Sequence, residues 1–205
     1  MKNSFRLLAL AAFTFLVGCS SSPTAPTTNN NSTESNATDS TSYFPLSTGS
    51  SWHYTGFADY TVSIVGDTTF NGHSWKIINN TASSGRGFVR KSGTTYINFS
   101  PSGQPVAGEF IGVNEAPGST WAWDITNNGL ATHYAFTNAK QGMTHIVLGK
   151  TYKNVIDVHL DYSSTFNGVV VQTSTGEYYY AQGIGLIDAD LGSLGSSQLT
   201  SYTIK

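Results

Sequence analysis

Hydrophobic and polar residues alternate along much of the chain beyond residue 43, most clearly over residues 154–163. One set of alternating side chains there comprises Ile156, Val158, Leu160 and Tyr162, and the other comprises Val155, Asp157, His159 and Asp161. A period of two is typical of a β-strand with one face on a core and the other in water. We therefore expect the first set to be buried and the second to lie mostly in solvent.

Runs rich in Val, Ile, Thr, Tyr and Phe are separated by short turn sequences. These are Asn71-Gly72, Ser92-Gly93, Asn127-Asn128-Gly129, Asn167-Gly168 and Thr175-Gly176. Asn-Gly favours the two-residue turn of a β-hairpin, and no run beyond residue 43 has the apolar stripe of a helix. We expect residues 43–205 to form an all-β, single antiparallel domain of about eleven or twelve strands. It would be a curved sheet or half-barrel, a sandwich or a barrel.

The first 19 residues follow a different pattern. Lys2 and Arg6 precede an apolar run of eleven residues, 7–17, which ends at Gly18-Cys19. A basic start followed by a short apolar segment is typical of a secretory signal peptide, and the run is shorter than the roughly 20 residues that span a bilayer. Leu16-Val17-Gly18-Cys19 resembles the lipobox of bacterial lipoproteins. The resemblance implies that residues 1–18 are removed and that Cys19 receives a diacylglyceryl thioether and an N-acyl chain such as palmitate.

Residues 20–42 resemble a spacer between this anchor and the domain. Seventeen of these 23 residues are Ser, Thr or Asn. Such a segment has too little apolar surface to offset the entropy of ordering, so we expect 19–42 to be a flexible linker that reaches roughly 25–30 Å. Ser20 follows the lipobox cysteine, and in lipoproteins a Ser there implies the outer membrane. Without an acidic cluster after Cys19, we expect the domain to face the periplasm.

Two segments near the ends of the domain resemble envelope lipoproteins of uncharacterised function. The first, 43–54, reads Y-F-P-L-S-T-G-S-S-W-H-Y and matches their Y-x-P-L-x-x-G-x-x-W-x-Y opening. The second, 180–187, reads Y-A-Q-G-I-G-L-I and matches their late Y-A-x-G-[VI]-G-L segment. The resemblance implies an antiparallel sheet, often a half-barrel, after the lipobox and spacer. It implies no catalytic residue.

Composition and charge restrict the possible functions. The chain is 39% hydrophobic and 13% aromatic, with only 11% charged residues. Beyond residue 18 it has eight Lys and Arg against twelve Asp and Glu. Because it has no basic cluster to neutralise phosphates, we expect no nucleic-acid partner. The single cysteine excludes an intrachain disulfide and a cysteine-based zinc site.

Candidate chemistry is sparse. The sequence lacks the common hydrolase, nucleotide-binding and metalloprotease motifs, so we expect no enzyme and no cofactor. Asp157, His159 and Asp161 share a face of one strand and could contribute to a zinc site, and Asp188 and Asp190 could offer oxygens to calcium from a loop. The same alternation also predicts an ordinary solvated face, so we expect no metal and interpret both acidic groups as surface.

Aromatic residues are the most suggestive feature. Twenty-three lie in 43–205, and the candidate ligand-binding residues among them are Trp121, Trp123, Tyr178 and Tyr180. Aromatics beyond those a core needs can line a site for lipid chains or stack on sugars. We expect an envelope lipoprotein that binds an apolar or amphipathic ligand without catalysis. The alternative is a structural or assembly partner of another envelope protein or a glycan.

Overall fold

The computed structural model describes residues 41–70, 72–83, 86–93, 95–99, 108–112, 116–192 and 195–205. The predicted signal peptide, Cys19 and nearly all of the linker lie outside these residues. Twelve strands account for most of the described chain. They are β1 (Ser51–Gly56), β2 (Tyr60–Phe70), β3 (His73–Asn80), β4 (Arg86–Ser92), β5 (Thr95–Phe99), β6 (Gly108–Gly112), β7 (Thr120–Asn127), β8 (Leu130–Val147), β9 (Lys150–Phe166), β10 (Val169–Ala181), β11 (Gly185–Asp190) and β12 (Ser196–Thr203). No described helix is long and apolar enough to cross a membrane.

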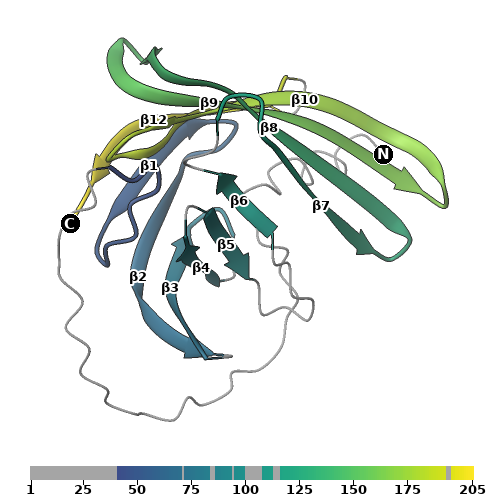
Figure 1. Cartoon of the computed structure of the whole chain (residues 1–205), viewed down its shortest axis with the longest axis horizontal. Coiled ribbons are helices and arrows are strands. Elements are labelled where there is room, and N and C mark those ends of the chain that lie inside the picture. Colours follow the sequence, from purple (N-terminus) through teal and green to yellow (C-terminus); the bar gives the residue numbers. More distant parts are fainter. Residues whose placement is uncertain are drawn as a thin grey trace.

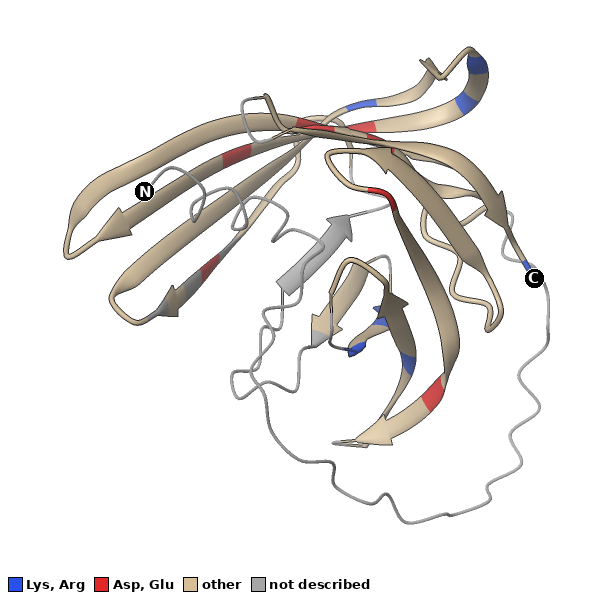
Figure 2. Ribbon diagram, turned by 180° about the vertical axis from the view of Figure 1, so that it is seen from behind, with Lys and Arg blue, Asp and Glu red and all other residues tan. Residues whose placement is uncertain are grey.

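The strands form one antiparallel sheet in the order β6-β5-β4-β3-β2-β1-β12-β11-β10-β9-β8-β7. Two meanders, β1–β6 and β7–β12, therefore join where the first strand pairs with the last. The sheet bends so that β2 and β3 lie on one flank and β7 to β10 on the other (Figure 1). The predicted all-β, antiparallel fold of about eleven or twelve strands is confirmed as one open, curved sheet. Charged residues are sparse along its ribbons (Figure 2).

Four of the five predicted turn sequences lie between strands that pair with each other, and one does not. Asn128-Gly129 joins β7 to β8, Asn167-Gly168 joins β9 to β10, and all four residues have positive φ, as a type I′ turn requires. Asn71 lies outside the described residues. Thr175-Gly176 was expected to interrupt a strand, but both residues lie inside β10. A Cβ on Gly176 would lie 2.7 Å from Cδ2 of Leu191, so this glycine permits close packing rather than a turn.

The two segments that resemble envelope lipoproteins lie against each other at the centre of the sheet. Trp52 donates a hydrogen bond from Nε1 to the carbonyl of Ile184 at 2.5 Å, and the Tyr54 hydroxyl donates to the carbonyl of Leu186 at 3.0 Å. A Cβ on Gly185, whose φ is +108°, would lie 3.3 Å from Nε1 of Trp52. Glycine at 185 therefore meets both a backbone requirement and a close approach to the indole.

The core lies on the concave inner face of the sheet. Ile156, Val158, Leu160 and Tyr162 of β9 are all buried there, as predicted. The prediction of a solvated outer face is wrong for Val155 and Asp157, which are 0% and 5% exposed. These two residues are buried because a part of the chain distant in sequence packs over them. The pairing of β8 with β9 shifts register three times between Asn138 and His145, and the far end of this hairpin covers the outer face.

Contacts of His145 show this cover directly. Its ring stacks on that of Tyr179 in β10, with 3.8 Å between centroids, and its Nε2 lies 2.9 Å from Oδ2 of Asp188 in β11. Asp188 and Asp190 were expected in a loop, but both belong to β11, and Asp188 is buried. The loop prediction failed because a strand buried on both faces lacks the polar alternation that reveals a half-exposed one.

Candidate ligand-binding face

Aromatic side chains dominate the inner face. They come from both halves of the sheet and pack into one hydrophobic cluster, whose buried aromatic members are Phe44, Trp52, Tyr54, Tyr60, Tyr96, Trp121, Tyr134, Phe136, Tyr152, Tyr162, Tyr178 and Tyr180. Alternation places most of those that belong to strands on the inner face, because every second residue of a strand points to the same face. No member carries a formal charge at neutral pH.

Three of the four predicted ligand-binding residues lie in one continuous row. Trp121 of β7 stacks on Phe136 of β8, with 5.7 Å between centroids and 5° between planes. Phe136 lies 6.4 Å from Tyr178, and Tyr178 lies 6.4 Å from Tyr180, both in β10. We call Trp121, Phe136, Tyr178 and Tyr180 the aromatic row. The main chain of Trp123 pairs opposite Tyr134, but its side chain lies outside the described residues.

Two polar atoms of the aromatic row have no hydrogen-bond partner within the described residues. They are Nε1 of Trp121 and the hydroxyl oxygen of Tyr178, and both are buried. Burial, the dominant cause, raises the pKa values of Tyr178 and Tyr180 well above that of free tyrosine, so both phenols stay protonated. The row therefore combines buried aromatic rings with two neutral groups that can donate a hydrogen bond.

The other aromatic donors of the cluster are better satisfied. Trp52 and Tyr54 donate to main-chain carbonyls, and the Tyr162 hydroxyl lies 2.7 Å from Oγ of Ser164. Most buried polar groups in proteins are paired in this way, so an unpaired one calls for an explanation. The unpaired donors fall on two neighbouring parts of one aromatic row, which is where the sequence predicted a ligand site.

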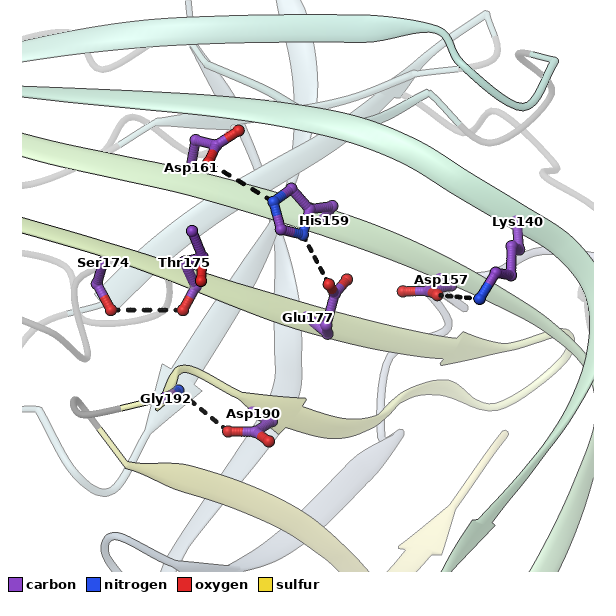
Figure 3. Close-up of polar contacts among 9 residues, drawn as sticks. All are labelled: Lys140, Asp157, His159, Asp161, Ser174, Thr175, Glu177, Asp190 and Gly192. Atoms are coloured by element: carbon purple, nitrogen blue, oxygen red, sulfur yellow. Dashed lines mark hydrogen bonds and ion pairs between the residues drawn. The ribbon is translucent and has the colours of Figure 1, made fainter.

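A second cluster, on the outer face of β9 and β10, contains most of the predicted metal candidates (Figure 3). His159 places Nδ1 2.6 Å from Oε1 of Glu177 and Nε2 3.6 Å from Oδ1 of Asp161. Lys140 of β8 places Nζ 3.9 Å from Oδ2 of Asp157. We call Lys140, Asp157, His159, Asp161 and Glu177 the outer polar network.

Glu177 and Lys140 are the members of this network that sequence reasoning missed, and Glu177 has the closer contact with His159. It lies directly opposite His159 in the pairing of β10 with β9. Its place on the same face as Tyr179 follows from alternation, but its partner depends on register. No local signal in the sequence gives that register, because Thr175-Gly176 suggested a break where the strand continues.

Asp157 and Glu177 form a carboxyl pair. Oδ1 of Asp157 and Oε2 of Glu177 are buried, and among the described residues neither accepts a hydrogen bond from a donor other than the opposing carboxyl group. Burial raises the pKa of Asp157 to about 6, a hydrogen bond with Glu177 and repulsion from its charge add to this, and Lys140 and His145 oppose it. A hydrogen bond between two carboxyl groups requires a proton on one of them. The hydrogen bond to Glu177 is also the main cause that raises the pKa of His159.

The predicted metal candidates do not converge on one point. Asp161 is exposed, Asp188 binds His145, and Oδ1 of Asp190 accepts a hydrogen bond from the main-chain nitrogen of Gly192 at 3.0 Å. In the part of the chain that the structure describes, no three His, Cys, Asp or Glu side chains are grouped to hold a metal ion.

No protein-family model and no curated protein matches the sequence. Two solved structures are similar to the chain, and each comparison covers 78% of this chain and 98% of the other. One is described as an exported protein with a YmcC-like fold from Bacteroides fragilis NCTC 9343, with 10% identity and a TM-score of 0.45. The other is described as a lipoprotein from Parabacteroides distasonis ATCC 8503, with 12% identity and a TM-score of 0.44.

Proposed function

We propose that the chain is an envelope lipoprotein that binds an uncharged apolar or amphipathic ligand on the aromatic row, without catalysis. The observation that carries this proposal is the pair of buried donors on Trp121 and Tyr178, for which no described residue is a hydrogen-bond partner. Each buried donor left without a partner costs about 1–3 kcal/mol. A ligand that brings an acceptor oxygen beside its apolar part would offset this cost and cover aromatic surface at the same time.

The chemistry of the row also favours one class of ligand. Small-molecule sites are mostly apolar and contain a few polar groups that fix orientation. The aromatic row fits this description and has no charged side chain to neutralise an ionic head group. An ester, hydroxyl or amide oxygen on a hydrocarbon or a sugar would suit both donors.

The proposed location depends on the N-terminal sequence. The lipobox ending at Cys19 supports a lipid anchor, and a chain with several acyl groups stays on the membrane. Ser20 supports the outer membrane, with the domain facing the periplasm. These features would place the inner face of the sheet near membrane lipids and near the cell-wall glycan.

A second candidate function is assembly with another envelope protein or a glycan. The observation that favours it is an exposed aliphatic group at the hairpin between β9 and β10. Val169, Val170 and Val171 are 66%, 59% and 52% exposed, and Phe166 lies beside them across the turn. Exposed apolar groups of this kind often mark interaction sites.

Binding of an environment-sensitive apolar dye, with displacement by a monoacylglycerol, tests the first function. In the full mature lipoprotein, the double variant Trp121→Phe with Tyr178→Phe should weaken binding at least about tenfold, since it removes two hydrogen bonds of about 1 kcal/mol each. The free energy of unfolding that it loses through the smaller side chain at position 121 should be partly offset, because the variant removes two buried donors that have no partner among the described residues. The matched control is Trp75→Phe, because Trp75 is buried in β3 of the other half and its Nε1 donates to the carbonyl of Phe70 at 3.4 Å.

The control should lose stability and keep dye binding. Equal dye binding by the wild type and the double variant would contradict the aromatic row as the site. A wild type that binds neither the dye nor the monoacylglycerol would favour the assembly function.

A further inference from the structure

The hairpin between β8 and β9 ends in two exposed aliphatic side chains. Ile146 is 64% exposed and Leu148 is 54% exposed, while their neighbours Val147 and Tyr152 are buried. The hairpin thus uses one face to pack on the domain and presents the other outward. The core gains nothing from Ile146 and Leu148, so their apolar character needs another explanation.

The turn does not explain Leu148 either. Leu148-Gly149 occupies the place that Asn128-Gly129 and Asn167-Gly168 occupy in two other hairpins. The first residue has a φ of 47°, 50° and 49° in the three turns, and the glycine has a φ of 79° in each. Asn accepts this left-handed conformation readily, whereas a bulky residue such as Leu rarely adopts it. Leucine is therefore present despite the turn and not because of it.

Positive charge surrounds this tip. Between Lys91 and Lys205 the only Lys or Arg residues are Lys140, Lys150 and Lys153, and all three belong to the β8–β9 hairpin. Figure 2 shows blue segments at the end of the projecting hairpin, whereas Nζ of Lys140 lies away from the tip, 3.9 Å from Oδ2 of Asp157. Ile146 pairs with Thr151, and Lys153 lies two residues beyond Thr151. Alternation therefore puts Lys153 on the same face as Ile146.

The hairpin is also held in place by the domain. His145 stacks on Tyr179 and binds Asp188, and Nζ of Lys150 donates to the carbonyl of Thr200 at 3.1 Å. A tip whose base is fixed loses little conformational entropy when it binds a surface. Its two aliphatic side chains and its lysines are thus presented together.

We propose that this tip, comprising Ile146, Leu148 and Lys153, inserts into the surface of an anionic bilayer. Aliphatic side chains gain free energy in the acyl region, and a lysine on its long apolar stem reaches the lipid phosphates. The contact rests on the lipid anchor of the proposed function, which keeps the tip near the membrane. It orients the domain, and it is separate from ligand binding by the aromatic row.

The test uses the lipidated protein reconstituted in phosphatidylethanolamine vesicles, with and without phosphatidylglycerol. Because Cys19 is the only native cysteine and carries the lipid, Leu148→Cys provides a single free thiol for an environment-sensitive fluorophore. On vesicles that contain phosphatidylglycerol, the emission of the fluorophore should shift to shorter wavelength. Nitroxide-bearing lipids in these vesicles should quench its fluorescence. Val170→Cys is the matched control, since Val170 is an equally exposed aliphatic residue on a hairpin tip without lysines. A label there should stay in water.

Two further variants separate the apolar and electrostatic contributions to the lipid contact. Because one of them changes Leu148, the fluorophore is attached at Ile146→Cys instead. Leu148→Asn should keep or raise the melting temperature, because Asn suits the turn, and weaken lipid contact about tenfold, as expected for one leucine. Lys153→Gln should weaken lipid contact about fivefold on anionic vesicles, as expected for one lysine near such a surface.

Flotation of the vesicles reports the anchor separately. A protein that floats while its label at position 148 stays in water overturns the tip contact and leaves the anchor intact. Equal quenching at positions 148 and 170 also overturns it, because the lysines would then have no role. A protein that does not float contradicts both the anchor and the tip contact.

Discussion

The two faces of β9 and β10 share a backbone but are built from opposite chemistry. The inner face carries Leu160, Tyr178 and Tyr180, which are all buried in an aromatic core. The outer face carries a network of carboxylates, histidine and lysine. Alternation assigns each side chain to a face, but burial depends on what covers that face. On the outer side, cover from the β8–β9 hairpin buries Asp157 while Asp161, four residues along the same strand, remains 65% exposed in its side chain.

The largest expected contrast between the faces comes from neighbouring residues of β9. Leu160→Ala should lower the free energy of unfolding by about 2–5 kcal/mol, because it leaves a cavity in a packed core. Asp161→Asn, one residue along and on the outer face, should change it by no more than about 0.5 kcal/mol. Urea denaturation of both variants measures the contrast. Similar losses in the two would show that the inner face is not the main source of stability.

Asp157→Asn should act in the opposite direction and stabilise the domain. The pKa of Asp157 is about 6 in the folded protein, above its ordinary value of 3.8. Protonated Asp157 therefore stabilises the folded protein fully below about pH 4. This stabilisation is lost as the pH rises through 6. Asn imitates the protonated acid, so the variant should gain on the order of 1–2 kcal/mol at pH 7 and little at pH 4.

Thermal unfolding between pH 4 and pH 8 measures this difference. The wild type should lose stability across the window from 4 to 6, and the variant should show a flatter profile. Asp161→Asn serves as the control, because an exposed residue on the same strand should change stability by no more than about 0.5 kcal/mol. A loss of stability for Asp157→Asn at pH 7 would mean that the ionised carboxylate is favoured where it lies, through Lys140.

His159→Gln should have the smallest effect. Its hydrogen bond to Glu177 raises the pKa of His159 above 6.5. The stabilisation is present below pH 6.5 and is lost as the pH rises through the folded pKa. Because the side chain is partly exposed, the variant should lose only about 0.5 kcal/mol at pH 5.5 and almost nothing at pH 8.5. A larger loss at pH 8.5 than at pH 5.5 would contradict this assignment.

The sequence predicts the inner face well and the outer face poorly, for physical reasons. Alternation along 154–163 identifies the buried set of β9, and Asn-Gly pairs locate the hairpins, because both signals are local. The same reasoning fails for Gly176, which serves packing against Leu191, and for Asp188, which lies in a strand covered on both sides. Cover and register depend on residues far apart in the chain, so the carboxyl pair of Asp157 and Glu177 has no local signature.

The candidate site divides in the same way. Trp121, Tyr178 and Tyr180 could be selected from the sequence as aromatics on one face of their strands. These residues form one row only because β7, β8, β9 and β10 pair in that order across the sheet. Only the packed structure shows that two donors of the aromatic row have no partner among the described residues. The proposed function rests on this observation.

Native mass spectrometry of the protein purified from its own cells tests the proposed function most directly. The account predicts a wild-type species that carries one uncharged amphipathic molecule in addition to the anchor. That species should be depleted in the double variant Trp121→Phe with Tyr178→Phe and retained in Trp75→Phe. A wild type that shows only the mass of the protein with its anchor, or an adduct retained by the double variant, would contradict a ligand site on the aromatic row.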